Sequence, residues 1–190
     1  VYSQSVGEAS VIVNAGGTIA GQNPDPGYAF KAPWQTRSPW DLFSQQVTFA
    51  GGGDKAPDYT GGTVSGQEIT ASVKGGAQAN VDVQVVYSLD GNFVGELYPE
   101  YRSQERFTQQ IIVPKILSVI RDTPSSATPV EFRGEKRGEI QDTMLERLNT
   151  SLSPYGVTVQ QVAIQDIRFT EDVELSIKNV EVAQQKEAEA

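Results

Sequence analysis

The last fifty residues decide how the chain folds. Residues 141–190 read QDTMLERLNTSLSPYGVTVQQVAIQDIRFTEDVELSIKNVEVAQQKEAEA. Apolar residues recur at helical spacing up to Leu152, and Gly156 supplies the left-handed backbone conformation in which many helices end. The segment from Val157 to Phe169 is typical of a strand. A second helix, the exit helix, is predicted after Thr170, and it reaches the last residue without a stop signal.

The predicted strand changes its phase twice. Alternate residues are apolar within three short runs, but the runs are out of step with one another. The apolar pairs are Val157 with Val159, Val162 with Ile164, and Ile167 with Phe169. Side chains of a regular strand alternate between two faces, so these shifts predict bulges, a bend or burial on both faces.

The composition excludes several classes of chemistry. The chain has 190 residues, with no Cys and no His. It therefore lacks a disulfide framework, a thiolate zinc site, a cysteine nucleophile and an imidazole base, which also excludes a Ser-His-Asp triad. The chain has 15 Lys+Arg and a net charge of −9. Nucleic-acid binding requires a cationic surface, so we do not expect nucleic acid as a partner. The sequence contains no run of about 18 apolar residues, so no membrane span is predicted within it.

No pattern of ionisable residues predicts catalysis. Carboxylates such as Glu105, Glu171 and Asp172 are available for acid–base work, but no spacing places two of them across a cleft. No loop has the alternating oxygen ligands of a calcium site. We therefore predict a protein that is not an enzyme, with no catalytic residue, no cofactor and no metal.

The first part of the chain is rich in turns and aromatic rings. A strand is predicted over residues 9–13, and two prolines with Gly27 predict a stiff turn over residues 23–27. The aromatic residues that follow are Tyr28, Phe30, Trp34, Trp40 and Phe43. We favour a small core packed around proline-fixed loops. The alternative is a surface at a bilayer interface, where Trp and Tyr are favoured. Its membrane-facing residues are Tyr28, Phe30, Trp34 and Trp40.

The middle of the chain predicts a sheet. A short strand over residues 47–49 precedes a glycine-rich segment, residues 51–66. We interpret that segment as a surface loop, because no phosphate-binding motif accompanies its glycines. Strict alternation along residues 69–73 and 81–89 predicts a β-hairpin with one buried face.

Two helical regions follow the hairpin. Residues 93–121 are helical in composition, with Pro114 in the first turn of a second piece. A loop over residues 122–129 precedes an amphipathic helix over residues 135–152. The charged residues around that helix, Arg133 and Arg137 among them, are interpreted as a solvated face supported by acidic neighbours.

In their order and spacing, these segments resemble the stomatin/prohibitin/flotillin (SPFH) domain, and among its members the prohibitins. The resemblance begins with Pro26-Gly27, Phe30, Pro33 and Trp34, and continues with Arg137-x-x-Ile140 in a helix. It is carried further by Leu148-x-x-x-Leu152-x-x-Tyr155-Gly156-Val157-x-Val159 and by Val162-x-Ile164-x-Asp166-Ile167. It closes with AQQKEAEA in the exit helix. Two features depart from the family: the glycine-rich segment is longer, and Thr170 stands where many members have Pro.

The resemblance implies an α+β fold, in which a curved, mostly antiparallel β-sheet packs with helices and precedes the start of a long coiled-coil helix. It divides the chain into a membrane-proximal subdomain (residues 1–46), a main subdomain (residues 47–169) and the start of the coiled coil (residues 170–190). It also implies a membrane anchor before the domain, assembly into large rings or cages, and no shared catalytic residue. Members organise membrane microdomains and hold or regulate membrane proteases and channels.

The expected function is therefore a non-enzymatic scaffold, attached to a membrane by an anchor that precedes Val1. Expected partners are other SPFH subunits, identical or different, a lipid bilayer, and a membrane protease or another membrane protein. We expect the exit helix to form the subunit interface, because its apolar residues follow a 4-3 spacing. The expected interface residues are Glu171, Asp172, Val173, Ile177, Val180 and Gln184. The alternatives are a soluble adaptor or assembly module of the same fold, and a hydrolase with a carboxylate or lysine centre.

Overall fold

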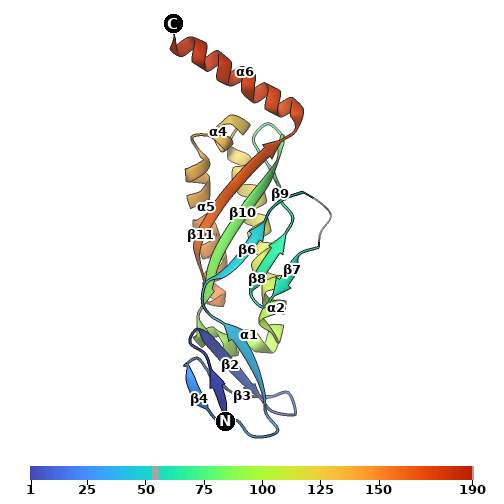
Figure 1. Cartoon of the computed structure of the whole chain (residues 1–190), viewed down its shortest axis with the longest axis vertical. Helices are drawn as coiled ribbons and strands as arrows, with labels where there is room; N and C mark the ends of the chain where they lie inside the picture. Colours follow the sequence, from blue (N-terminus) through green and yellow to red (C-terminus); the bar gives the residue numbers. More distant parts are fainter. Residues whose placement is uncertain (53–55, 190) are drawn as a thin grey trace.

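The long strands β10 (Gln78–Leu89) and β11 (Val157–Phe169) pair antiparallel in the main sheet (Figure 1). The computed structural model describes residues 1–52 and 56–189. The other strands of this six-stranded sheet are β6 (Gln45–Phe49), β7 (Asp58–Thr60), β8 (Thr63–Gly66) and β9 (Ile69–Ser72). Their order is β11-β10-β6-β8-β7, with β9 also paired to β10. Only β6 and β8 pair in parallel among the described strands of this sheet, so the predicted α+β class with a mostly antiparallel sheet is confirmed.

Helices α3 and α5 pack against one face of the main sheet. The helices before the exit helix are α1 (Val94–Tyr101), α2 (Gln104–Phe107), α3 (Val113–Asp122), α4 (Pro129–Arg133) and α5 (Arg137–Leu152). A π-helical turn covers Thr108–Ile112, and short 3-10 turns cover Gly91–Phe93, Thr123–Ser126 and Ser153–Tyr155. Ile120 of α3 and Leu148 of α5 are buried in the same core as Val83 of β10. Pro114 lies in the first turn of α3, as predicted.

The two phase shifts predicted in β11 are bulges. Asp82 and Val83 are consecutive on β10, but their partners on β11 skip Gln165. A second shift in register skips Gln160 in the same way. Each extra residue resets the alternation, so the Val and Ile side chains of β11 all point into one core.

Two small sheets form the N-terminal end of the molecule. In the first, β2 (Glu8–Val13) lies between β3 (Ile19–Asn23) and β5 (Thr36–Asp41). In the second, β1 (Tyr2–Gln4) pairs with β4 (Gly27–Ala29). They lie at the opposite end of the elongated chain from the exit helix, α6 (Glu171–Ala188) (Figure 1). One hydrophobic cluster runs from the three-stranded sheet into the main sheet. The subdomain boundaries at residues 46 and 169 stay predictions.

The prediction that Trp40 faces a membrane is wrong. Its side chain is fully buried, and its ring centroid lies 6.0 Å from that of Phe107. Alternation along β5 turns Trp40 inward, where α2 covers it. The favoured prediction of a small aromatic core is wrong as well, because the other large rings of this region, Phe43 included, are mostly exposed.

The described part of the glycine-rich segment contains a hairpin, so its interpretation as a loop is wrong. Strands β7 and β8 pair around a turn that contains Gly61 and Gly62. Gly61 has a φ of +60°, which favours glycine. A Cβ on Gly62 would lie 2.9 Å from the hydroxyl of Tyr87, which donates a 2.5 Å hydrogen bond to the Gly62 carbonyl. The turn and this close approach therefore explain both glycines. Residues 53–55 of the segment lie outside the described residues.

Helix side chains occupy the outer edge of β11, on the side away from β10. Asn149 of α5 donates to the carbonyl of Val159 at 3.0 Å and accepts from its N–H at 2.8 Å. Gln141 accepts from the N–H of Ile164 at 2.8 Å. These amides replace the hydrogen bonds that a further strand would make, so they protect the edge.

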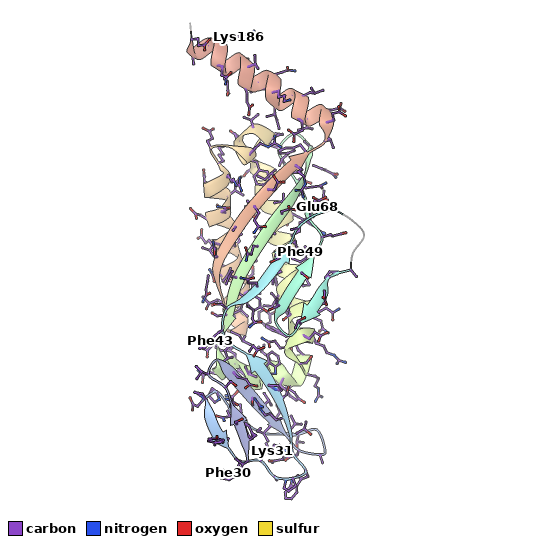
Figure 2. All side chains as sticks on the ribbon, viewed as in Figure 1. Phe30, Lys31, Phe43, Phe49, Glu68 and Lys186 are labelled. Carbon is purple, nitrogen blue, oxygen red and sulfur yellow. The ribbon has the colours of Figure 1, made fainter. Side chains whose placement is uncertain are left out.

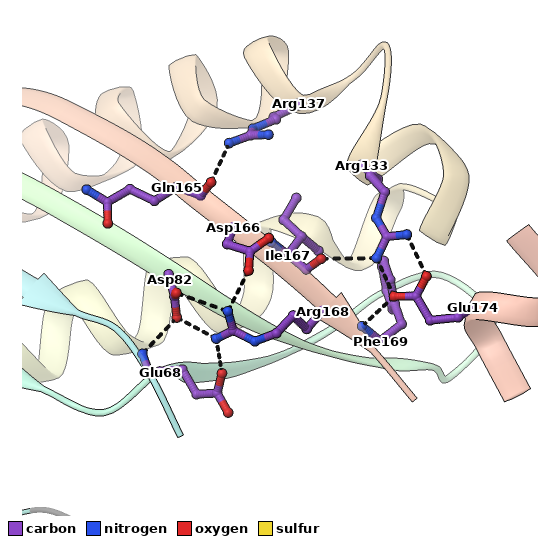
Figure 3. A network of polar contacts seen from close by, with 11 residues as sticks. Glu68, Asp82, Arg133, Arg137, Gln165, Asp166, Ile167, Arg168, Phe169 and Glu174 are labelled. Carbon is purple, nitrogen blue, oxygen red and sulfur yellow. Dashed lines mark hydrogen bonds and ion pairs between the residues drawn. The ribbon is translucent and has the colours of Figure 1, made fainter. Parts of the chain in front are cut away.

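Two arginines bind further backbone groups along the outer edge of β11. Arg137 donates to the carbonyls of Ile164 and Gln165, and Arg133 donates to that of Ile167 at 3.0 Å. Figure 3 shows the contacts with Gln165 and Ile167. Residues 137, 141 and 149 of α5 are separated by four or eight positions, which places their side chains along one side of that helix, and Arg133 at the end of α4 extends the series. The interpretation of Arg133 and Arg137 as a solvated face is therefore wrong.

Replacing Asn149 by Leu should lower the free energy of unfolding by about 1–3 kcal/mol, because both backbone groups of Val159 lose their partner. Thr150→Leu, at an exposed position of the same helix, is the matched control and should change it by less than about 0.5 kcal/mol. Denaturant titration measures both values. Equal effects of the two substitutions would contradict the role assigned to Asn149.

Candidate functional site

One arginine fixes the exit helix α6 to the rest of the molecule. Arg133, the last residue of α4, forms a bidentate ion pair with Glu174 in the first turn of α6, with 2.6 Å between Nη1 and Oε2 (Figure 3). The same guanidinium lies over the ring of Phe169, 5.2 Å from its centroid. Glu174 also accepts from the backbone N–H of Phe169 at 3.2 Å. Arg133 therefore joins α4, the end of β11 and α6.

The ion pair stabilises the charged forms of both partners. The hydrogen bond from Arg133 lowers the pKa of Glu174 from its ordinary value to about 2, and the Phe169 N–H acts in the same direction. The hydrogen bond to Glu174 raises the pKa of Arg133. The two side chains are 34% and 35% exposed, so solvent screens this pair more than a buried one.

An open groove of about 830 Å³ lies between α4 and α6, hereafter the α4–α6 groove. Its α6 side is formed by Val173, Ser176, Ile177, Val180, Glu181 and Gln184. Its α4 side includes Val130, Glu131 and Glu135. The groove therefore combines an apolar floor with an acidic rim, and its size is in the range of ligand and peptide sites.

Four of the six residues predicted for a subunit interface line the α4–α6 groove, namely Val173, Ile177, Val180 and Gln184. The other two, Glu171 and Asp172, are exposed in the first turn of α6. Ile177 is only 3% exposed, because it packs inward at the contact between α6 and α4. Its assignment to the subunit interface is therefore corrected: this side chain holds α6 on its own domain. The role of the other five residues stays a prediction.

Three aromatic side chains near the opposite end of the molecule are exposed. Tyr28 in β4, Phe30 directly after it and Trp34 in the following loop are 85%, 83% and 65% exposed. Lys31 lies at the same end as Phe30 (Figure 2). Large exposed rings beside a cation are typical of a surface that meets a bilayer interface. Tyr28, Phe30 and Trp34 are hereafter the aromatic tip.

A second charged cluster lies on the main sheet. Arg168 of β11 contacts Asp82 of β10 at 2.7 Å, Asp166 at 2.5 Å, and Glu68, which precedes β9 (Figure 3). The hydrogen bond from Arg168 lowers the pKa of Asp82. One guanidinium thus compensates three carboxylates and ties β11 to β10 and to the segment before β9, which favours a structural role.

The described residues show neither a membrane span nor a metal centre. No helix within residues 1–52 and 56–189 combines the length and the apolar character needed to cross a bilayer. The same residues contain no group of three side chains suited to hold a metal ion.

The roles of Arg133 and Glu174, which fix α6, were not predicted from the sequence. The spacing of Arg137 and Gln141 in α5 is a signal for a row of side chains, but it does not identify a strand edge as their target. Arg133 lies in a separate helix, so no periodicity points to it. Glu174 has no comparable signal, because acidic residues are common in the first turn of any helix.

Replacing Glu174 by Gln should reduce stability by about 1 kcal/mol at neutral pH, since it removes a partly solvated ion pair. The folded-state pKa of Glu174 is depressed, so its contribution is complete well above the ordinary pKa of 4.5 and is lost as the pH falls toward 2. Denaturant titrations at neutral and acidic pH should therefore show a difference between wild type and E174Q that shrinks in acid. Glu171→Gln, an exposed neighbour, is the control. A difference that does not change with pH would contradict the pairing.

Residues 3–190 match the SPFH domain / Band 7 family. No curated protein matches the chain significantly. The family match covers nearly the whole chain and confirms the SPFH resemblance, whereas the closer likeness to prohibitins stays a prediction. Proteins of this family are generally membrane-associated scaffolds without enzymatic activity. The chain belongs to the SPFH domain / Band 7 family.

Proposed function

We propose that the chain is a non-enzymatic scaffold domain that contacts a membrane with its aromatic tip and assembles laterally through α6. The observation that carries this proposal is the placement of the two surfaces at opposite ends of the elongated molecule (Figure 1). A subunit whose aromatic tip touches a bilayer holds its α6 away from the lipid. Neighbouring subunits on the same membrane then bring their exit helices side by side.

The assembly is a large ring or cage of SPFH subunits, identical or different, and it encloses a membrane microdomain. Within that enclosure it regulates membrane proteins such as proteases, as prohibitin-like scaffolds do. Attachment comes from an apolar anchor before Val1, and the aromatic tip adds a contact beside it. The family membership supports this proposal, because SPFH proteins are generally membrane-associated scaffolds.

The chemistry of the α4–α6 groove favours a binding surface over an active site. At the groove, Arg133 is paired with Glu174, and Glu131 is paired with Lys136. An active site brings together ionisable groups whose pKa values are shifted toward neutrality. In the groove the pKa of Glu131 is lowered and that of Arg133 is raised, so both are shifted away from neutrality.

The double substitution Phe30→Ser and Trp34→Ser should weaken binding of the chain to lipid vesicles at least about tenfold. Loss of two interfacial rings costs more than the ~1.4 kcal/mol that corresponds to this factor. Phe43→Ser is the matched control, because Phe43 is 62% exposed but lies away from the tip (Figure 2). Co-sedimentation with vesicles of phosphatidylcholine and phosphatidylserine measures the three affinities.

Wild-type chain that stays in the supernatant at all lipid concentrations would contradict membrane contact through the tip. It would favour the soluble adaptor of the same fold. Equal loss of binding in the tip variant and in F43S would show that the rings of the tip have no special role.

A further inference from the structure

Helix α6 carries a second apolar stripe, which points away from the α4–α6 groove. Leu175 and Val182 are 55% and 49% exposed, and Lys178 and Lys186 flank them. At roughly 100° per residue, this stripe lies about 180° around the helix from the side chains that line the groove. Leu175, Lys178, Val182 and Lys186 are hereafter the basic stripe.

The groove and the basic stripe are complementary in charge. Glu135 and Glu181 line the groove and form no ion pair among the described residues. Within the same part of the chain, Lys178 and Lys186 form none either. The other charged side chains of the groove are already paired. The groove thus offers two carboxylates, and the stripe two ammonium groups, that form no direct ion pair among the described residues.

Their apolar residues also match in spacing. Leu175 and Val182 are seven residues apart, and so are Val173 and Val180 on the groove side. Seven residues are close to two helical turns, so two parallel helices bring such pairs into register. The groove opens to solvent, so a helix from outside the chain has access to it.

We propose that the α4–α6 groove of one copy receives the basic stripe of α6 from a second copy. This inference rests on the lateral assembly proposed above and adds which surfaces meet. Leu175 and Val182 of the incoming helix pack on Val173 and Val180, and its two lysines face Glu135 and Glu181.

The proposed contact is directional. Its two surfaces differ and lie on opposite sides of α6, so each copy binds one neighbour with its groove and another with its stripe. Such heterologous contacts repeat from copy to copy. They close into a ring when a whole number of these rotations completes a full turn. A symmetric dimer in which the same surface meets itself is a different arrangement, and the experiments below separate the two.

Charge reversal of each surface tests the pairing. The double variants K178E/K186E and E135K/E181K should each raise the dissociation constant for self-association at least about tenfold, since like charges then face each other. An equimolar mixture of the two should restore association, because each groove again meets a stripe of opposite charge. Sedimentation velocity over a concentration series measures all three samples.

The matched control for K178E/K186E is K74E/K115E, which makes the same change in net charge on the body of the domain. It should associate like the wild type. Circular dichroism and thermal unfolding of every variant show whether the domain is intact. Association that is unaffected by either reversal, or that is lost in both and not restored on mixing, would overturn the proposed contact.

Disulfide trapping tests the direction of the contact independently. The chain has no Cys, so an introduced thiol is unique. Val180→Cys marks the groove and Val182→Cys marks the stripe, and both substitutions are small changes at exposed positions. Under mild oxidation the mixed sample should form V180C–V182C dimers in clear excess over dimers of either variant alone. Dimers of one variant with itself in equal yield would overturn the head-to-tail arrangement.

The outcomes distinguish this inference from the function on which it rests. Wild-type chain that remains monomeric both in solution and on vesicles overturns lateral assembly and this contact together. Wild-type chain that assembles on vesicles but ignores the charge reversals and gives no mixed disulfide overturns this contact alone.

Discussion

The guanidinium of Arg133 is the contact on which the C-terminal part of the structure depends. It binds the carbonyl of Ile167, covers the ring of Phe169 and pairs with the carboxylate of Glu174. Beyond this point α6 has little support, because Ile177 is its only buried residue among those described. One ion pair and one apolar side chain therefore set the direction of α6. That direction defines the α4–α6 groove and turns the opposite side of the helix toward solvent.

The row of polar side chains along β11 has a consequence for assembly. A long edge strand readily pairs with a strand of another chain. In β11 the outward backbone groups of Val159 and Ile164 are already bound by Asn149, Gln141 and Arg137. Addition of a strand there would break these hydrogen bonds, and each buried group left unpaired costs about 1–3 kcal/mol. The β11 edge of the main sheet is thus protected against the addition of a strand.

Local periodicity predicts much of this fold and fails where distant residues decide. The alternation in β10, the helical stripe of α5 and both bulges of β11 follow from patterns within a few residues. The burial of Trp40 follows from its contact with Phe107, which no local pattern indicates. A 4-3 spacing is the same whether Ile177 faces its own α4 or another copy, so the sequence could not separate the two. The partners of Arg133, Ile167 and Glu174, lie more than thirty residues away in the sequence, so local sequence indicated only a solvated charge.

Arg133 and Ile177 hold α6 in one defined direction relative to the rest of the domain. Because the chain has no Cys, spin labels can be attached at Asp142→Cys in α5 and at Glu187→Cys near the end of α6. Pulsed electron paramagnetic resonance of the doubly labelled chain, diluted with unlabelled chain, measures the distance between the labels within one molecule. The structure predicts a single narrow distribution. A broad distribution, or several separate distances, would contradict the account, because neither Arg133 nor Ile177 would then hold α6 in place.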